Sequence, residues 1–139
     1  MKYWKDSQEA VTAIKKMWDL IGENQELREA AKKVNQLILF DYSVDEPNCG
    51  VWFDCRDGGY TVGTGIPSDT PDLTMSCSLD DAHLSWMDQL NPVIAITRKR
   101  VKVKGNATGM LRLVPKLKIV KEIYKKALTD LGMADKLNM

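Results

Sequence analysis

The sequence has no long apolar run, few cysteines and a single histidine, and each of these absences excludes a class of protein. No stretch of the 139 residues approaches the roughly 18 consecutive apolar residues that span a membrane. The three cysteines are odd in number, which argues against a disulfide framework and favours a reducing compartment. The segment MKYWKDSQEA carries charges where a signal peptide needs its apolar stretch. We therefore expect a cytoplasmic protein with a single domain over residues 1–139.

The net charge of +1 conceals two oppositely charged segments. Residues 41–88 contain ten acidic side chains and one basic side chain, a net charge of −9. Residues 98–126 contain eleven basic side chains and one acidic side chain, a net charge of +10. Two interpretations stay open. Either these are solvated surface groups that partly offset each other, or the basic segment forms a cationic face for an anionic surface or ligand headgroup.

Hydrophobic periodicity predicts helices at both ends of the chain and strands between them. Helical spacing covers residues 7–22 and 26–34, and a last helix follows Pro115. The turn Asp57-Gly58-Gly59 is typical of a hairpin. The fold class is α+β, with a mixed, mainly antiparallel five-stranded sheet and helices packed on one face. The elements predicted between the terminal helices are strands over residues 37–44, 50–56, 60–64, 72–77 and 100–105 and short helices beginning at Asp80 and Asn91.

Few residues in the chain have catalytic or metal-binding potential. His83 is the only histidine, and no nucleophile or orienting group lies beside it in the sequence. Cys49, Cys55 and Cys77 would complete a four-ligand zinc site with it, but no Cys-x-x-Cys pair is present. We therefore interpret the cysteines as small buried hydrophobes. We expect no enzyme activity, no cofactor and no metal.

The basic segment Arg98–Lys104 also has to be weighed as a nucleic-acid interface. Its four alternate basic residues would project from one face of a continuous strand. No aromatic residues interleave with these charges, as a base-stacking platform requires, so we expect no nucleic-acid partner. Transient contact with an anionic membrane surface is a better explanation of the same charges than nucleic-acid binding. Charged residues on an edge strand also discourage aggregation.

One ordered set of motifs extends from Asp72 to Gly105. An Asp opens a strand, an acidic pair opens a helix, Asn-Pro opens a shorter helix, and a basic strand ends in glycine. The members are Asp72-Leu73-Thr74, Asp80-Asp81, Asn91-Pro92-Val93-Ile94-Ala95 and Lys102-Val103-Lys104-Gly105. This set resembles the sterol carrier protein type 2 lipid-binding domain family, over about Leu37 to Lys118. The chain departs from that family in two loops, where Asp88-Gln89 and Arg98-Lys99 stand in place of glycine.

The resemblance implies an apolar cavity between the sheet and its helices. Such a cavity would bind and transfer a hydrophobic small molecule, such as a fatty acid, an acyl-CoA or another lipid, without a chemical step. Two alternatives stay open: the same side chains simply fill a core, or the domain has a filled cavity and docks to an enzyme through its charged faces. An enzyme on this scaffold would rest on His83 alone. The residues expected to line the cavity are Met75, Trp86, Met87, Ile94, Ile96, Met110 and Leu113.

Overall fold

The computed structural model describes residues 1–138, and its centre is a five-stranded sheet in the order β3-β2-β1-β4-β5. The central strand β1 pairs antiparallel with β2 and parallel with β4, and the other two pairings are antiparallel. This confirms the mixed, mainly antiparallel sheet predicted from the sequence. The strands are β1 (Leu37–Asp41), β2 (Gly50–Asp54), β3 (Thr61–Thr64), β4 (Leu73–Ser76) and β5 (Lys102–Gly105).

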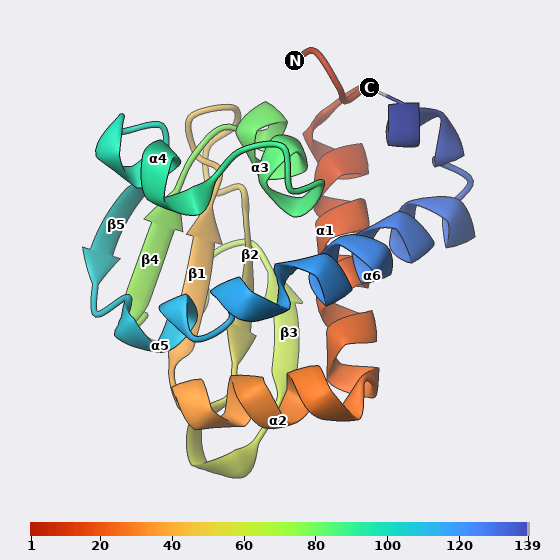
Figure 1. The fold of residues 1–139 in the computed structure, drawn as a ribbon. Helices are drawn as coiled ribbons and strands as arrows, with labels where there is room; N and C mark the ends of the chain where they lie inside the picture. The colour runs from red at the N-terminus through yellow and green to blue at the C-terminus, as the bar shows by residue number, and fades with distance from the viewer. Residues whose placement is uncertain (139) are drawn as a thin grey trace.

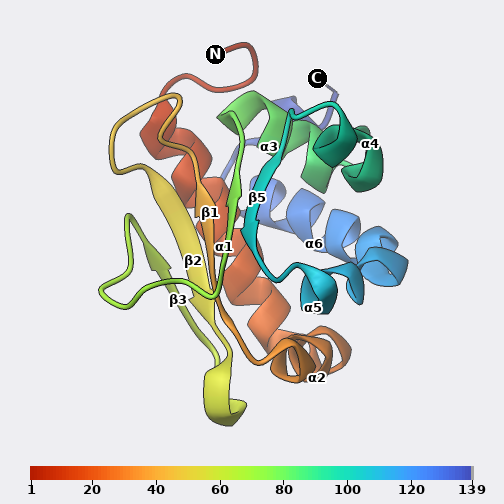
Figure 2. The same ribbon diagram turned by 90° about the vertical axis from the view of Figure 1, so that its left-hand side faces the viewer.

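The helices lie on one face of this sheet, as the rotated view in Figure 2 shows. Helices α1 and α6 pack against each other, α2 lies across one end of the sheet, and α3 and α4 cover the other end (Figure 1). Within residues 1–138, no helix is long and apolar enough to cross a membrane. The helices are α1 (Ser7–Glu23), α2 (Gln25–Val34), α3 (Leu79–Trp86), α4 (Pro92–Thr97), α5 (Thr108–Leu111) and α6 (Leu117–Asp130), with 3-10 turns η1 (Arg56–Gly58), η2 (Val114–Lys116) and η3 (Ala134–Asn138).

Side chains that accept hydrogen bonds fix where the first four helices begin. The Asp6 carboxylate accepts from the third backbone N–H after it at 2.8 Å, and Asn24 and Ser78 cap α2 and α3 in the same way at 3.0 Å. Asn91 caps α4, and Pro92 occupies its first turn, where a missing N–H has no consequence. These caps set the direction in which each helix leaves its loop.

The motif residues that suggested the family hold the backbone together. The Asp72 carboxylate accepts a hydrogen bond from the Leu37 N–H at 2.9 Å and so ties β4 to the start of β1. Asp80 accepts from two backbone N–H groups at the amino terminus, at 2.7 and 3.0 Å. Gly105 has φ of 109°, and a Cβ there would lie 2.2 Å from the Asp72 carbonyl oxygen. Only glycine fits at that point, which explains why the basic strand ends in this residue.

Two predicted elements begin later in the structure than the sequence suggested. The strand expected from residue 100 begins at Lys102, because the N–H groups of Arg98 and Arg100 still bond back to α4. Arg98 and Arg100 therefore do not share a strand face with Lys102 and Lys104, and the predicted four-residue basic strand face was wrong. The last helix begins at Leu117, after the 3-10 turn η2.

An aromatic stack anchors the packed part of the molecule, between α1 and the sheet. The Trp18 ring stacks on Phe53 and Phe40 with centroid distances of 4.3 and 5.4 Å. Ile14 on the same helix and Tyr124 on α6 are fully buried around this stack. Burial of this many large apolar side chains supplies the main driving force for folding.

Candidate functional site

An apolar cavity of about 120 Å³ lies between the sheet and the helices, and the Trp18 and Phe40 rings of the aromatic stack form part of its wall. Its lining comes from β1, β4, α1 and α2, together with α3, α4, α5 and the start of α6. None of the 22 described residues that line it carries a charged side chain. A surface of this kind favours an uncharged, hydrophobic occupant because a buried charge without a partner is very unfavourable.

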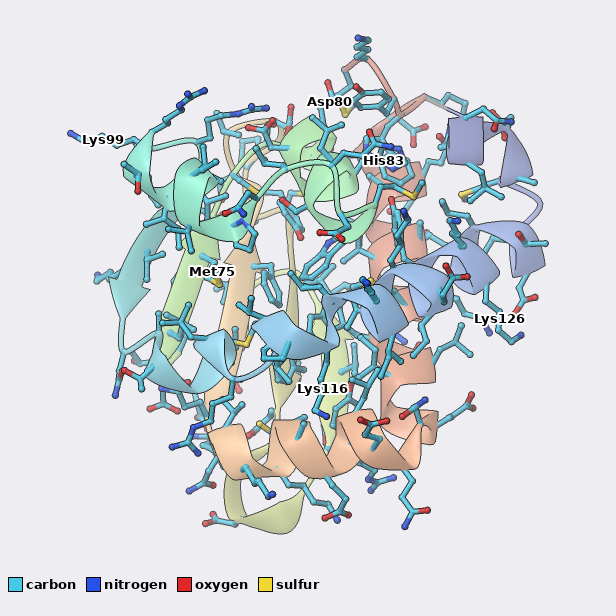
Figure 3. The ribbon with its side chains drawn as sticks, viewed as in Figure 1. Met75, Asp80, His83, Lys99, Lys116 and Lys126 are labelled. Atoms are coloured by element: carbon cyan, nitrogen blue, oxygen red, sulfur yellow. The ribbon has the colours of Figure 1, made fainter. Side chains whose placement is uncertain are left out.

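Five of the seven residues predicted to line the cavity lie on its wall. They come from four separate stretches of the chain, so only the tertiary fold brings them together. Met75 on β4, labelled in Figure 3, lies on the sheet between α4 and α5. The five are Met75, Trp86, Ile96, Met110 and Leu113.

Met87 and Ile94 are not among the described residues that line the cavity. Met87 is the residue after the last residue of α3, and it is 3% exposed in the main core. Ile94 points outward from α4 and is 47% exposed, while its neighbour Ala95 is fully buried.

The sequence analysis missed several residues that line the cavity, three of them on strands or just after a strand. Phe40 and Tyr42 follow Ile38 at strand spacing, and Cys77 follows Met75 in the same way. Strand alternation was the available signal for these three. Trp18 also lines the cavity, but no local pattern separates it from the other buried residues of α1.

The mouth of the cavity is surrounded by exposed apolar side chains. Leu111 on α5 and Val114 on η2 line the cavity, yet they are 49% and 37% exposed. Pro92 and Ile96 of α4 also line the cavity and are partly exposed. Exposed apolar residues grouped around an apolar cavity mark an interaction site.

Titratable groups on the wall stay neutral. Burial raises the pKa of the Cys77 thiol to about 12, and the nearby Asp81, Asp45 and Asp41 carboxylates raise it further. Burial likewise raises the pKa of the Tyr42 hydroxyl well above its ordinary value. A neutral thiol is a poor nucleophile and a poor metal ligand, so the wall offers packing instead of reactivity.

His83 lies in a different, closely packed environment. It is fully buried, and its Nδ1 is 2.7 Å from the Tyr124 hydroxyl of α6. The Tyr3 and Trp4 rings contact the imidazole at centroid distances of 4.8 and 5.5 Å. In the described part of the chain, no three His, Cys, Asp or Glu side chains are grouped as metal ligands. The histidine therefore joins α3 to α6 and does not face the cavity.

The amino-acid sequence matches a known family model over the part of the chain that forms the sheet and most of its helices. The model of the SCP-2 sterol transfer family matches residues 14–118, which is most of the chain and includes both sides of the cavity. The chain belongs to the SCP-2 sterol transfer family. The resemblance suggested by the motifs between Asp72 and Gly105 is thereby confirmed.

Other members of the SCP-2 family show the same fold at low sequence identity. The sterol carrier protein domain 2 of Helicoverpa armigera superposes with a TM-score of 0.61 at 18% identity, covering 76% of this chain and 83% of that one. The apo form of sterol carrier protein 2 from Yarrowia lipolytica gives 0.55 at 22% identity, covering 87% and 91%. Human hydroxysteroid dehydrogenase-like protein 2 is 33% identical over 86 residues, or 61% of this chain. The match spans only 20% of that longer protein.

Proposed function

We propose that this protein binds one hydrophobic small molecule in the cavity and transfers it without a chemical step. The observation that carries the proposal is the uncharged cavity between β1, β4 and the helices, with its apolar rim. The five predicted lining residues on the wall support it, and we propose that they contact the ligand. Removal of apolar ligand area from water, at about 25 cal/mol per Å², would drive binding.

The cavity size limits how much of a ligand can be enclosed. One water molecule needs roughly 10–15 Å³ of such space, so the cavity holds about eight to twelve water-sized groups. A methylene group occupies about as much volume as a water molecule. A medium-length acyl chain would therefore fit inside, and the rest of a longer lipid would lie in the mouth.

The charges near the mouth provide a way to exchange the ligand with a membrane. Arg98 and Lys99 follow α4, and Arg112 and Lys118 lie close in sequence to the rim residues; all four are exposed. None of them forms an ion pair within residues 1–138. Exposed apolar side chains beside unpaired cations suit a surface of anionic lipids. We therefore propose a transient membrane contact at this rim.

The first experiment is native mass spectrometry of the freshly purified protein, with solvent extraction of bound material. A co-purifying apolar species of defined mass is the expected result. Titration with a fluorescent fatty acid follows, using Ala107→Trp to fill the cavity from its wall and the adjacent exposed Thr108→Trp as the matched control. We expect the first variant to lose binding and the second to keep it. Equal binding by both would place the ligand outside the cavity and overturn the proposal.

A second candidate is an accessory domain that acts beside an enzyme. It is favoured by one observation: in human hydroxysteroid dehydrogenase-like protein 2 the matching segment makes up only 20% of the protein. In this alternative, the charged faces dock to an enzyme partner. Ligand-free protein that binds no fatty acid and elutes with a partner enzyme would support the alternative over the carrier.

A further inference from the structure

Three polar groups on residues of the cavity wall could not form a hydrogen bond with a purely hydrocarbon ligand. They are the Tyr42 hydroxyl and the indole N–H groups of Trp18 and Trp86, all on residues that line the cavity. Each of these atoms is buried, and none makes a hydrogen bond of acceptable geometry within the described residues. Tyr42 is 1% exposed and Trp18 is 2% exposed, so bulk water does not form hydrogen bonds with them. Buried donors without acceptors are rare in native proteins.

The three groups cannot satisfy one another. The Trp86 indole lies close enough to Tyr42 to lower the hydroxyl pKa, against the larger effect of burial, although the two do not align as a regular hydrogen bond. Indole nitrogen only donates, so the Tyr42 oxygen is the single acceptor in the set. Even if both indoles donated to that oxygen, the hydroxyl proton would still need an acceptor. In any arrangement of these three groups, the Tyr42 hydroxyl proton is left without an acceptor.

The remaining wall does not supply that acceptor in this structure, and it cannot hold an anion. The Ser85 hydroxyl donates to the Asp81 carbonyl oxygen at 2.8 Å and forms no hydrogen bond with Tyr42 or either indole, and the Cys77 thiol is neutral and only a weak acceptor. No Lys, Arg or His lines the cavity among residues 1–138, so a carboxylate at this depth would have no countercharge. The acceptor that fits is a neutral oxygen.

We propose that the ligand carries a neutral oxygen acceptor, such as a ketone or ester carbonyl, on the part that enters first, and that Tyr42 donates to it. The inference rests on the proposed function and narrows its ligand class. It separates oxygenated lipids from simple hydrocarbon chains by a hydrogen bond at the inner end of the cavity. A fatty acid bound with its methyl end inward leaves the same donors unsatisfied.

The test compares methyl decyl ketone with dodecane, each delivered from cyclodextrin, by displacement of a fluorescent fatty acid. We expect the wild type to prefer the ketone by about tenfold, as for a buried hydrogen bond with a neutral partner. Tyr42→Phe keeps the ring and removes the hydroxyl, so the preference should fall to about twofold or less. Tyr124→Phe is the matched control, because that buried hydroxyl bonds to His83 and lies off the cavity wall. It should keep the full preference.

The outcomes separate this inference from the proposed function. If neither probe displaces the fatty acid because no fatty acid binds, the carrier proposal itself fails. If both probes bind equally well to the wild type, the carrier proposal stands and the hydrogen bond is overturned. A water molecule held at Tyr42 beside the ligand would give this second result. If Tyr42→Phe is poorly folded, Trp86→Phe removes a second donor and should reduce the same preference.

Discussion

Two regions on the same face of the sheet are packed in opposite ways. Under α1 and α6, the Trp18, Phe40 and Phe53 rings stack and leave the surrounding side chains fully buried. Trp18 and Phe40 also line the cavity, which extends under α4 and α5, where Leu111 and Val114 are exposed. Close packing of side chains stabilises the first region. The second region lacks that close packing and has an exposed apolar surface. We propose that a ligand or a membrane covers this surface.

The largest expected effect comes from truncating one side chain in each region. Phe53 is fully buried against Trp18, so Phe53→Ala should lower the free energy of unfolding by about 3–5 kcal/mol. Met75 already lies beside empty space, so Met75→Ala should cost only about 1 kcal/mol. Urea unfolding of both variants measures the difference. Equal losses would mean that the cavity side is packed as tightly as the other.

The next effect concerns membrane contact at the cavity rim. Removing two cations near an anionic surface weakens binding by about 1 kcal/mol each, so the double variant Arg98→Gln with Lys99→Gln should bind about thirtyfold more weakly. Sedimentation with phosphatidylcholine vesicles, with and without phosphatidylserine, measures this. Lys125→Gln with Lys126→Gln removes the same charge from the packed side. Lys99 and Lys126 lie at opposite sides of the molecule in Figure 3.

The two double variants distinguish a local docking surface from a general charge effect. If both weaken vesicle binding equally, net charge alone is responsible and the rim has no special role. If neither does, the membrane contact is absent. The comparison between the regions predicts a loss for the rim variant alone, because Lys125 and Lys126 flank no exposed apolar side chains of the cavity mouth.

A smaller effect is expected from an ion pair that fastens the last turn of the chain to the packed region. The Lys136 ammonium is 2.9 Å from the Glu9 carboxylate, with only 8% and 18% of the two side chains exposed, and it lies over the Trp4 ring. Lys136→Ala should therefore lower the free energy of unfolding by about 1–3 kcal/mol. Lys126→Ala, which breaks an exposed pair with Asp130, should cost about 0–1 kcal/mol.

The Glu9 pair also gives the packed region a pH dependence. The Lys5 N–H, which donates to the carboxylate at 3.0 Å, lowers the pKa of Glu9, and Lys136 lowers it further. A depressed pKa stabilises the fold above the unfolded pKa of glutamate, and this contribution is lost as pH falls through the lower folded value. Unfolding measured at neutral pH and near pH 3 should show less acid sensitivity in Lys136→Ala. An unchanged acid sensitivity would assign the effect to Lys5 alone.

The sequence predicted the strands and helices well because their signals are local. Strand alternation, the Asn91-Pro92 cap and the terminal glycine at Gly105 each need only a few neighbouring residues. The cavity wall depends on contacts between distant segments, and there the prediction was partial. It included Met87 and Ile94, which do not line the cavity, and it omitted Tyr42, whose hydroxyl becomes informative only when its surroundings are known to lack an acceptor.

The two departures from the family pattern become intelligible in the structure. Asp88 and Lys99 have φ of 58° and 60°, the left-handed conformation that glycine adopts without strain. The left-handed conformation destabilises a residue with a side chain by about 1–2 kcal/mol. Substitution by glycine removes this strain, but part of the gain is offset because glycine makes the unfolded chain more flexible. Both loops border α4, on the open side of the molecule. The protein thus keeps a charged side chain beside the cavity mouth at a conformational disadvantage.

The smallest expected effect tests whether that disadvantage serves binding. Lys99→Gly should raise the free energy of unfolding by about 0.5–1 kcal/mol, because relief of the left-handed strain exceeds the added flexibility of the unfolded chain. Asp88→Gly should be nearly neutral, since aspartate tolerates this conformation better. Only Lys99→Gly should also weaken binding to anionic vesicles, by about fivefold. A variant that is more stable but binds vesicles less well would show that the open region trades stability for contact, whereas unchanged vesicle binding would leave the lysine without a role at the rim.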